Sequence, residues 1–554
     1  MAIDRTRTTT PDVQFNVIDL FAGVGGFTLG FRGIVADGNC EFVPKLMVDI
    51  DRSACQAAVR NMPDVRVLAA DVHTLSGAEI RKRSGLAPEA HVHVLLGGPP
   101  CQGFSFLGKR SLSDPRNLHV VDFLRIVKEI RPLVAVMENV PLIVTSHDGA
   151  VIREVCEGLS KLGYASCAEI LCANEFGVPQ IRKRAFVLAY RSDMGVSPEL
   201  PKRTHERIIN ASDLTDGGKR VRFEADKTPF VSVEEAIGDL PPLCAGEGED
   251  VVPYTGSATS EYQRRAREGS IAVFNHRSRS HSPSFLKKIA VISEGSSNQN
   301  LPDDLRFSDN YFSQAYARLH RNGLANTITT SFGNPGSGRF MHYRDLRSIS
   351  VREAARLQSF PDTFVFDGDF TTQMRHVGNA VPPLLARGIR NGIAMDLCEF
   401  TAAQAGRSGE SRPRRVETSE ERSRVMRSVP SKDTSAELLL RKALRSAGMR
   451  AFRTHSARVP GTPDLVFTRP KVAVFVDGCF WHGCPKCYRE PSTNKTYWKM
   501  KVRRNRDRDA KVSAECRKSG WRVVRLWEHE ILKTPARAAT KVIKEVEKRR
   551  ARCR

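Results

Sequence analysis

Short apolar runs alternate with helix-like segments over the first part of the chain. The runs occupy residues 15–21, 45–48, 65–69, 92–96 and 133–137. Runs of this length are typical of buried strands. Strands that alternate with helices favour an α/β fold built on a doubly wound parallel sheet. Such sheets carry their functional loops at the carboxyl ends of the strands.

Chemically active side chains stand just after several of these runs. They are Asp49, Asp71, Cys101 and Glu138, and Cys101 follows two prolines. Because the carboxyl ends of parallel strands meet at one edge of a sheet, we expect these side chains to face a common site.

The pattern changes twice further along the chain. Residues 191–340 are polar and irregular, and a helical pattern returns at 350–358. Small, polar and basic residues at 402–416 suggest a linker. Two capping-box patterns, "TSEE" and "TSAE", then predict new helices. We therefore expect a core at 15–190, an irregular module at 191–340, a return to the core at 341–400, a linker at 401–417 and a second domain at 418–554.

Charge separates the two parts of the chain. Residues 401–554 hold 39 Lys and Arg against 16 Asp and Glu, whereas residues 1–400 hold 47 against 46. The basic part suggests a polyanionic partner, most simply nucleic acid, and the alternative is a solvated basic face. The chain opens with no apolar signal-peptide core, and no apolar run approaches the ~20 residues of a membrane span. We therefore expect reduced thiols, a cytoplasmic protein and no membrane partner.

Two motifs in the first part suggest a nucleophile and a cofactor. In "GGPPCQGFSF", Cys101 is either a small buried residue or a thiolate nucleophile. In "DLFAGVGGF", a glycine turn links a strand to a helix, and Asp49 ends the next strand, where a carboxylate can bind ribose hydroxyls. The turn and the acid together favour an adenosine-containing cofactor.

These motifs, with "MENV", "QIRKRAFVLAY" and "QMRHVGNAVPP" in this order, resemble the DNA (cytosine-5) methyltransferase family over residues 15–395. The resemblance implies a Rossmann-like fold that uses S-adenosylmethionine, and a target-recognition region within 191–340. It implies that a cytosine flipped out of double-stranded DNA is attacked at carbon 6 by Cys101. Glu138 would give a proton to ring nitrogen 3. A helix cap or surface acid is the alternative for this residue, but an acid directly after the apolar run 133–137 is expected at the edge of the sheet that carries the site.

The resemblance also assigns the remaining residues of this site. Arg182 would contact the base and the sugar-phosphate, and Arg184 lies on the same strand face; a solvated basic strand edge is the alternative. The cofactor pocket would be lined by Phe21, Gly23, Gly25, Asp49, Asp71 and Asn379.

The basic domain holds a second set of candidate residues. Asp464 in "PGTPDLVF" and Asp477 at the end of "VAVFVD" could bind Mg²⁺ through oxygen, although an Asp after Pro is equally a turn residue. In "DGCFWHGCPKC", Cys479, Cys484, Cys487 and His482 have the residue types of a zinc site.

This domain resembles the very-short-patch repair endonuclease family, which nicks DNA at T:G mismatches, over about 418–535. The resemblance implies that Asp464 binds the metal, that His482 acts near the scissile phosphate and that Glu437 is a further active-site acid. A capping role for Glu437 remains an alternative. Zinc would then take Cys479, Cys484, Cys487 and His529. The residues Phe480, Trp481 and Trp498 would wedge beside the mismatch, or else pack in the core. Some family members have histidine at the position of Asp477.

Together the resemblances predict a bifunctional bacterial enzyme associated with the nucleoid. It would methylate cytosine in a specific DNA sequence and nick the T:G mismatch that forms when methylcytosine deaminates. We expect a monomer that uses S-adenosylmethionine, Mg²⁺ and structural Zn²⁺, with mismatch-repair proteins as further partners. Two alternatives keep the methyltransferase: the basic domain is a non-catalytic zinc-bearing DNA-binding tail, or it is a restriction endonuclease.

Overall fold

The computed structural model describes residues 13–35, 39–100, 118–145, 149–206, 227–301, 314–407, 435–449, 451–454, 456, 459–479, 484–488 and 495–552. The chain divides into two compact units, residues 1–412 and 413–554. Among the described residues, no helix is long and apolar enough to cross a membrane.

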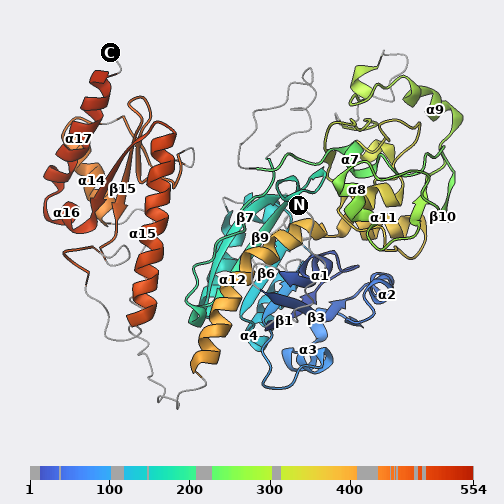
Figure 1. Cartoon of the computed structure of the whole chain (residues 1–554), viewed down its shortest axis with the longest axis horizontal. Coiled ribbons are helices and arrows are strands. Elements are labelled where there is room, and N and C mark those ends of the chain that lie inside the picture. The colour runs from blue at the N-terminus through green and yellow to red at the C-terminus, as the bar shows by residue number, and fades with distance from the viewer. Residues whose placement is uncertain are drawn as a thin grey trace. The chain divides into compact units, whose positions relative to one another are not determined.

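A mixed sheet with the order β2-β3-β1-β5-β6-β9-β7 forms the centre of the first unit, and β4 also pairs with β3 (Figure 1). Its strands are β1 (Val13–Leu20), β2 (Gly33–Val35), β3 (Cys40–Asp49), β4 (Arg66–Ala69), β5 (Val94–Gly97), β6 (Val134–Asn139), β7 (Tyr164–Cys172) and β9 (Lys183–Arg191).

The strands β4, β3, β1, β5 and β6 are parallel, whereas β2 and β9 run antiparallel to their neighbours. The sheet is therefore mixed, and the expected parallel arrangement is confirmed for these five strands. The long strand β9 lies between β6 and β7 and runs antiparallel to both.

Helices cover both faces of this sheet, as apolar side chains on both faces of the central strands require. One face packs against α1 (Gly26–Phe31) and α12 (Pro383–Arg407). The other packs mainly against α3 (Gly77–Ser84), α4 (Leu118–Ile130) and α6 (Ala150–Lys161). The helix α12 continues into the segment expected as linker.

The remaining helices and strands of the first unit are short. They are α2 (Arg52–Asn61), α5 (Leu142–Thr145), β8 (Gln180–Ile181), α7 (Val233–Ile237), β10 (Gly248–Val252), α8 (Glu261–Arg267), β11 (Val273–Arg277), α9 (Pro283–Ala290), β12 (Ala325–Asn326), α10 (Val351–Leu357) and α11 (Phe370–Asn379). Most of them form a separate apolar cluster with residues 319–380. The two-residue strands β8 and β12 pair in parallel, and this pair joins the apolar cluster to the segment before β9.

The second unit is a four-stranded mixed sheet with helices on both faces. Its order is β13-β14-β15-β16, and only the β15–β16 pair is parallel. Its elements are α14 (Ser435–Ser446), β13 (Arg453–Thr454), β14 (Leu465–Phe467), β15 (Val472–Asp477), α15 (Lys495–Lys518), β16 (Arg522–Trp527), α16 (Glu528–Lys533) and α17 (Pro535–Arg552). The helices α14, α16 and α17 cover one face, and α15 covers the other.

Candidate functional site

A glycine turn follows β1 at the carboxyl edge of the large sheet. Phe21, Gly23 and Gly25 all have positive φ, at 57°, 55° and 90°. The carboxylate of Asp49, at the end of the neighbouring strand β3, accepts the N–H of Gly23 at 2.7 Å and thereby ties the turn to the sheet. A Cβ on Gly23 would meet no atom within 4 Å, whereas one on Gly25 would overlap Met47 and Met62. Gly23 therefore borders open space, whereas the backbone of Gly25, at φ 90°, has a conformation that favours glycine.

Asp19 lies at the base of this turn and is only 1% exposed. Its Oδ2 accepts a 2.6 Å hydrogen bond from the Thr28 hydroxyl, and its Oδ1 has no hydrogen-bond partner among the described residues. Burial raises the pKa of Asp19 to about 7, against the opposing effect of the Thr28 bond. The sequence motif contains this acid, but no local pattern indicated that its carboxyl group would be buried with a hydrogen bond to one of its two oxygens.

Two further predicted cofactor residues reach the same part of the molecule from other elements. Asp71 follows β4 and caps a short turn by accepting the N–H of His73 at 2.9 Å. Asn379 is exposed at the end of α11. The preceding Gly378 packs so closely that a Cβ there would lie 2.5 Å from the backbone of Thr329 and Thr330.

Cys101 lies outside the described residues, which stop at Pro100. The side-chain amide of Asn139 donates a 3.0 Å hydrogen bond to the carbonyl of Pro99. Asn139 is buried at the end of β6, beside Glu138. This bond holds Pro99, two residues before Cys101 in the sequence, against the strand that carries Glu138.

Glu138 and Arg184 form an ion pair at the edge of the sheet. Arg184 Nε lies 2.9 Å from Glu138 Oε1, and both side chains are mostly buried, at 15% and 14% exposure. Burial raises the pKa of Glu138, and the charges of Arg184 and Arg182 oppose that rise. The buried carboxyl group of Glu138 therefore holds its proton more tightly than an exposed one, while the two arginines favour its charged form.

Arg182 lies in the interior. It is 1% exposed, and its guanidinium donates to the carbonyls of Ile328, Gly378 and Ala380 at 2.8–3.2 Å. Gln180, two residues earlier, is also buried and bonds to Leu357, Gln358 and Ile328. The "QIRKR" segment therefore holds the loop of Asn379 in place, and Arg184 is its member that meets Glu138.

Three predicted acids of the second unit occupy different settings. Asp464 Oδ2 accepts the N–H of Val476 at 2.7 Å, across the β14–β15 pair. Glu437, in the first turn of α14, is buried and accepts a 3.0 Å bond from Arg441. Asp477 is 7% exposed, and its two carboxylate oxygens are held by Arg525.

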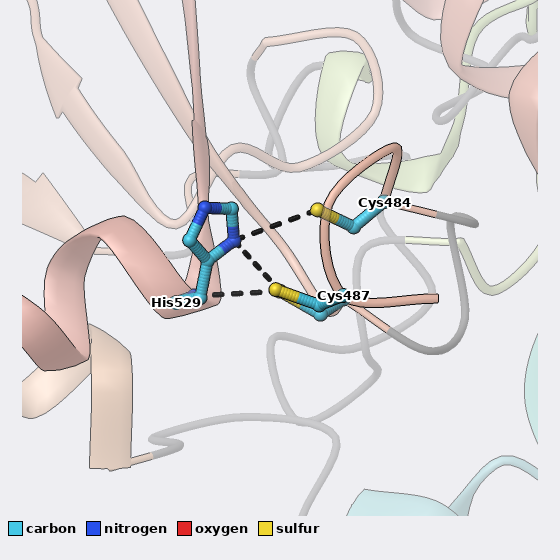
Figure 2. A group of neighbouring side chains, drawn as sticks. Cys484, Cys487 and His529 are labelled. Atoms are coloured by element: carbon cyan, nitrogen blue, oxygen red, sulfur yellow. Dashed lines mark hydrogen bonds between the residues drawn. The ribbon is translucent and has the colours of Figure 1, made fainter. Parts of the chain in front are cut away.

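The ligand atoms of Cys479, Cys484, Cys487 and His529 all lie within 4.8 Å of one another. His529 Nδ1 is 3.2 Å from the Cys479 sulfur and 3.5 Å from the Cys484 sulfur. Figure 2 shows His529, at the start of α16, facing the loop that carries Cys484 and Cys487. Burial is the main cause that raises the pKa of the Cys479 thiol to about 12, whereas backbone N–H groups of Lys486 and Cys487 help lower that of Cys484.

His482, Phe480 and Trp481 lie outside the described residues, and Trp498 lies on α15, where its side chain is not described. Arg525 was missed by the sequence analysis, because an arginine in the basic run of this domain carries no local signal.

Comparison with known proteins finds a matching family model in each part of the chain. The family model for C-5 cytosine-specific DNA methylases matches residues 15–394, and the model for the DNA mismatch endonuclease Vsr matches residues 415–489. The chain belongs to the C-5 cytosine-specific DNA methylase family and also carries a Vsr endonuclease domain, which confirms both resemblances.

Individual relatives match the first unit. The type II methyltransferase M.DdeI of Desulfomicrobium norvegicum is 36% identical over 68% of this chain and 88% of its own length. The type II methyltransferase M1.HphI of Haemophilus parahaemolyticus is 33% identical over 69% and 87%. A crystal structure described as that of a prophage-encoded DNA modification methyltransferase from E. coli is 25% identical, with a TM-score of 0.52, over 68% of this chain and 98% of that one.

Proposed function

We propose that this protein methylates carbon 5 of cytosine in a specific DNA sequence and nicks DNA at T:G mismatches. The Glu138–Arg184 pair, next to the hydrogen bond from Asn139 to Pro99, supports the first activity most directly. The two activities are complementary, because deamination of 5-methylcytosine leaves thymine opposite guanine. One unit would make the lesion-prone base, and the other would begin its repair.

The covalent chemistry of the family would rest on Cys101 and Glu138. Cys101 would add as a thiolate to carbon 6 of the flipped cytosine, which makes carbon 5 nucleophilic. Glu138, whose pKa is raised by burial, would give its proton to ring nitrogen 3 as negative charge develops there. After methylation, a base takes the carbon 5 proton, the thiolate leaves carbon 6, and the proton on ring nitrogen 3 returns to Glu138, which restores the aromatic ring. Bound S-adenosylmethionine would supply the methyl group as an electrophile on a sulfonium sulfur.

The glycine turn fits a positively charged, adenosine-containing cofactor. Gly23 leaves open space beside the turn, and the buried Asp19 has one carboxyl oxygen without a partner among the described residues. S-adenosylmethionine carries a sulfonium and an ammonium, so an acid in this position would favour its binding. Asp49 and Asp71 would then serve the adenosine part, with Phe21 and Asn379 completing the pocket.

Arg184 is better placed than Arg182 to meet the flipped base. Its partner Glu138 is the residue that would touch the base, whereas the guanidinium of Arg182 is occupied by backbone carbonyls. Arg182 would act by fixing the segment around Asn379. Both arginines would still contribute positive potential that favours the thiolate form of Cys101.

The Cys₃His cluster fits structural zinc. Tetrahedral zinc places its ligands at about 2.3 Å for sulfur and about 2.0–2.1 Å for nitrogen, so two ligand atoms stand roughly 3.5–3.8 Å apart. The distances of 3.2 and 3.5 Å from His529 Nδ1 to two sulfurs are close to this spacing. Cys479, Cys484, Cys487 and His529 would hold the ion and fix the loop that carries His482.

The nuclease chemistry would rest on the residues around that loop. Asp464 would bind Mg²⁺, and His482 would act near the scissile phosphate. Glu437 would be a further active-site acid, although its bond to Arg441 suits a structural role equally well. Phe480, Trp481 and Trp498 would wedge beside the mismatch. Double-stranded DNA is the partner that both families imply.

Two assays test the proposal separately. Purified protein should transfer labelled methyl groups from S-adenosylmethionine to DNA, and Cys101→Ser should not; transfer by this variant would refute the nucleophile. With Mg²⁺ the protein should nick a T:G duplex, and Asp464→Ala should not; equal nicking by the variant would refute the metal site.

The same nicking assay distinguishes the roles of the basic domain. A DNA-binding tail would bind all duplexes and nick none. A restriction endonuclease would cut an unmethylated T:A or C:G duplex at the target sequence. A mismatch endonuclease should nick the T:G duplex and leave the matched duplexes intact.

A further inference from the structure

Arg525 connects three elements of the second unit. It lies on β16, directly opposite Phe475 of β15, and its guanidinium stacks over the Phe475 ring at 5.0 Å. Its Nε and Nη2 atoms donate to the two carboxylate oxygens of Asp477 at 2.8 and 2.5 Å. On its other side it reaches Asp509 Oδ1 at 3.2 Å and Ser513 Oγ at 3.3 Å, both on α15.

These contacts occupy the whole guanidinium. Arginine has five N–H donors in a fixed fork, and Nη1 also points to the carbonyl of Asp509 at 3.5 Å. The paired bonds to Asp477 have the bidentate geometry that makes arginine–carboxylate pairs strong. Asp477 thus has both oxygens engaged in a site that is 7% exposed.

Mg²⁺ needs carboxylate oxygen at about 2.0–2.1 Å in near-octahedral geometry. For Asp477 to bind the ion, Arg525 would have to leave, and a largely buried guanidinium would lose its main partner. Breaking such a pair is costly because it leaves an uncompensated charge. The contact described for Asp464 is of another kind, because its Oδ2 accepts the backbone N–H of Val476 at 2.7 Å.

We propose that Asp477 is not a metal ligand and that Arg525 is a positioning residue. Arg525 clamps α15 to β15, the strand that leads to the proposed zinc ligand Cys479. This inference rests on the proposed nuclease activity. The clamp gives α15, which bears Trp498, a fixed place relative to Asp464.

The test uses the full chain with Asp477→Asn, Arg525→Met and the double variant. Arg522→Ala is the matched control, because it removes a half-exposed ion pair with Glu545 from the same strand. All four tryptophans, Trp481, Trp498, Trp521 and Trp527, lie in the second unit, so tryptophan fluorescence follows its unfolding alone. We expect each single variant to lower Tm by about 10 °C and the double variant to lose no more than the worse single variant. A fall in Tm of the double variant equal to the sum of the two single falls would show that Asp477 and Arg525 act independently, and would overturn the clamp.

The second readout separates positioning from metal binding. The Mg²⁺ concentration for half-maximal nicking should stay within twofold of wild type in Asp477→Asn and Arg525→Met, while kcat falls about tenfold or more in both. A rise of tenfold or more in that concentration for Asp477→Asn alone would make Asp477 a ligand and refute the inference. If the wild type nicks no duplex, the proposed activity fails, and the Tm cycle still decides whether the clamp exists.

Discussion

Replacing Asp19 by Asn should change how the stability of the first unit depends on pH. Burial raises the pKa of Asp19 from 3.8 to about 7. A carboxyl whose pKa is higher in the folded state favours folding while it is protonated, and this contribution is lost as the pH rises through the folded-state pKa. A shift of about 3 pKa units corresponds to about 4 kcal/mol. Relative to wild type, the Asn variant should therefore gain about 4 kcal/mol of unfolding free energy between pH 4 and pH 8.

Urea unfolding followed by circular dichroism measures this difference. Tryptophan fluorescence identifies the transition of the second unit, because all four tryptophans lie there. The Asn side chain keeps the size of Asp19 and its contact with Thr28, so packing is matched. A relative gain below about 1 kcal/mol over this pH range would refute the view of Asp19 as a buried, protonated acid. S-adenosylmethionine should protect wild type more than the variant at pH 8, because only the carboxylate attracts its positive charge.

Other predictions address the remaining sites. Glu138→Gln should slow single-turnover methylation by about 10²–10⁴-fold. The methylation rate of wild type should fall as the pH rises past the raised pKa of Glu138. This fall should be absent from Glu138→Gln, and its persistence in the variant would contradict the role of Glu138. His529→Ala should lose zinc, measured by metal analysis, and lower the Tm of the second unit, whereas His482→Ala should keep zinc and lose nicking; the reverse result would make His482 the ligand. Gly378→Ala should cost about 1–3 kcal/mol of stability, because its Cβ would overlap the backbone of Thr329 and Thr330, whereas Gly256→Ala, which faces open space, should stay within about 0.5 kcal/mol. Equal unfolding free energies for the two glycine variants would refute the packing argument.

Part of the first site can be predicted from the sequence, because the carboxyl ends of parallel strands meet at one edge of the sheet. Asp49 and Glu138 end strands that run parallel in the central sheet, so their position follows from apolar runs and chain order. The direction of β9 does not follow from such runs, because a buried apolar strand has the same sequence pattern in parallel and antiparallel sheets. The interior position of Arg182 also depends on partners 146 to 198 residues away, which no local pattern specifies.

The Cys₃His cluster shows why spacing alone could not choose its histidine. In the sequence, His482 lies among the three cysteines, and His529 is 42 residues beyond the last of them. The parallel pairing of β15 and β16 sets Asp477 opposite Trp527. Cys479 and His529 each follow that pair by two residues, so both leave the sheet at the same edge and meet there at 3.2 Å. The fourth position of the cluster is therefore set by strand register, and a histidine one residue earlier or later on α16 would turn away from the sulfurs.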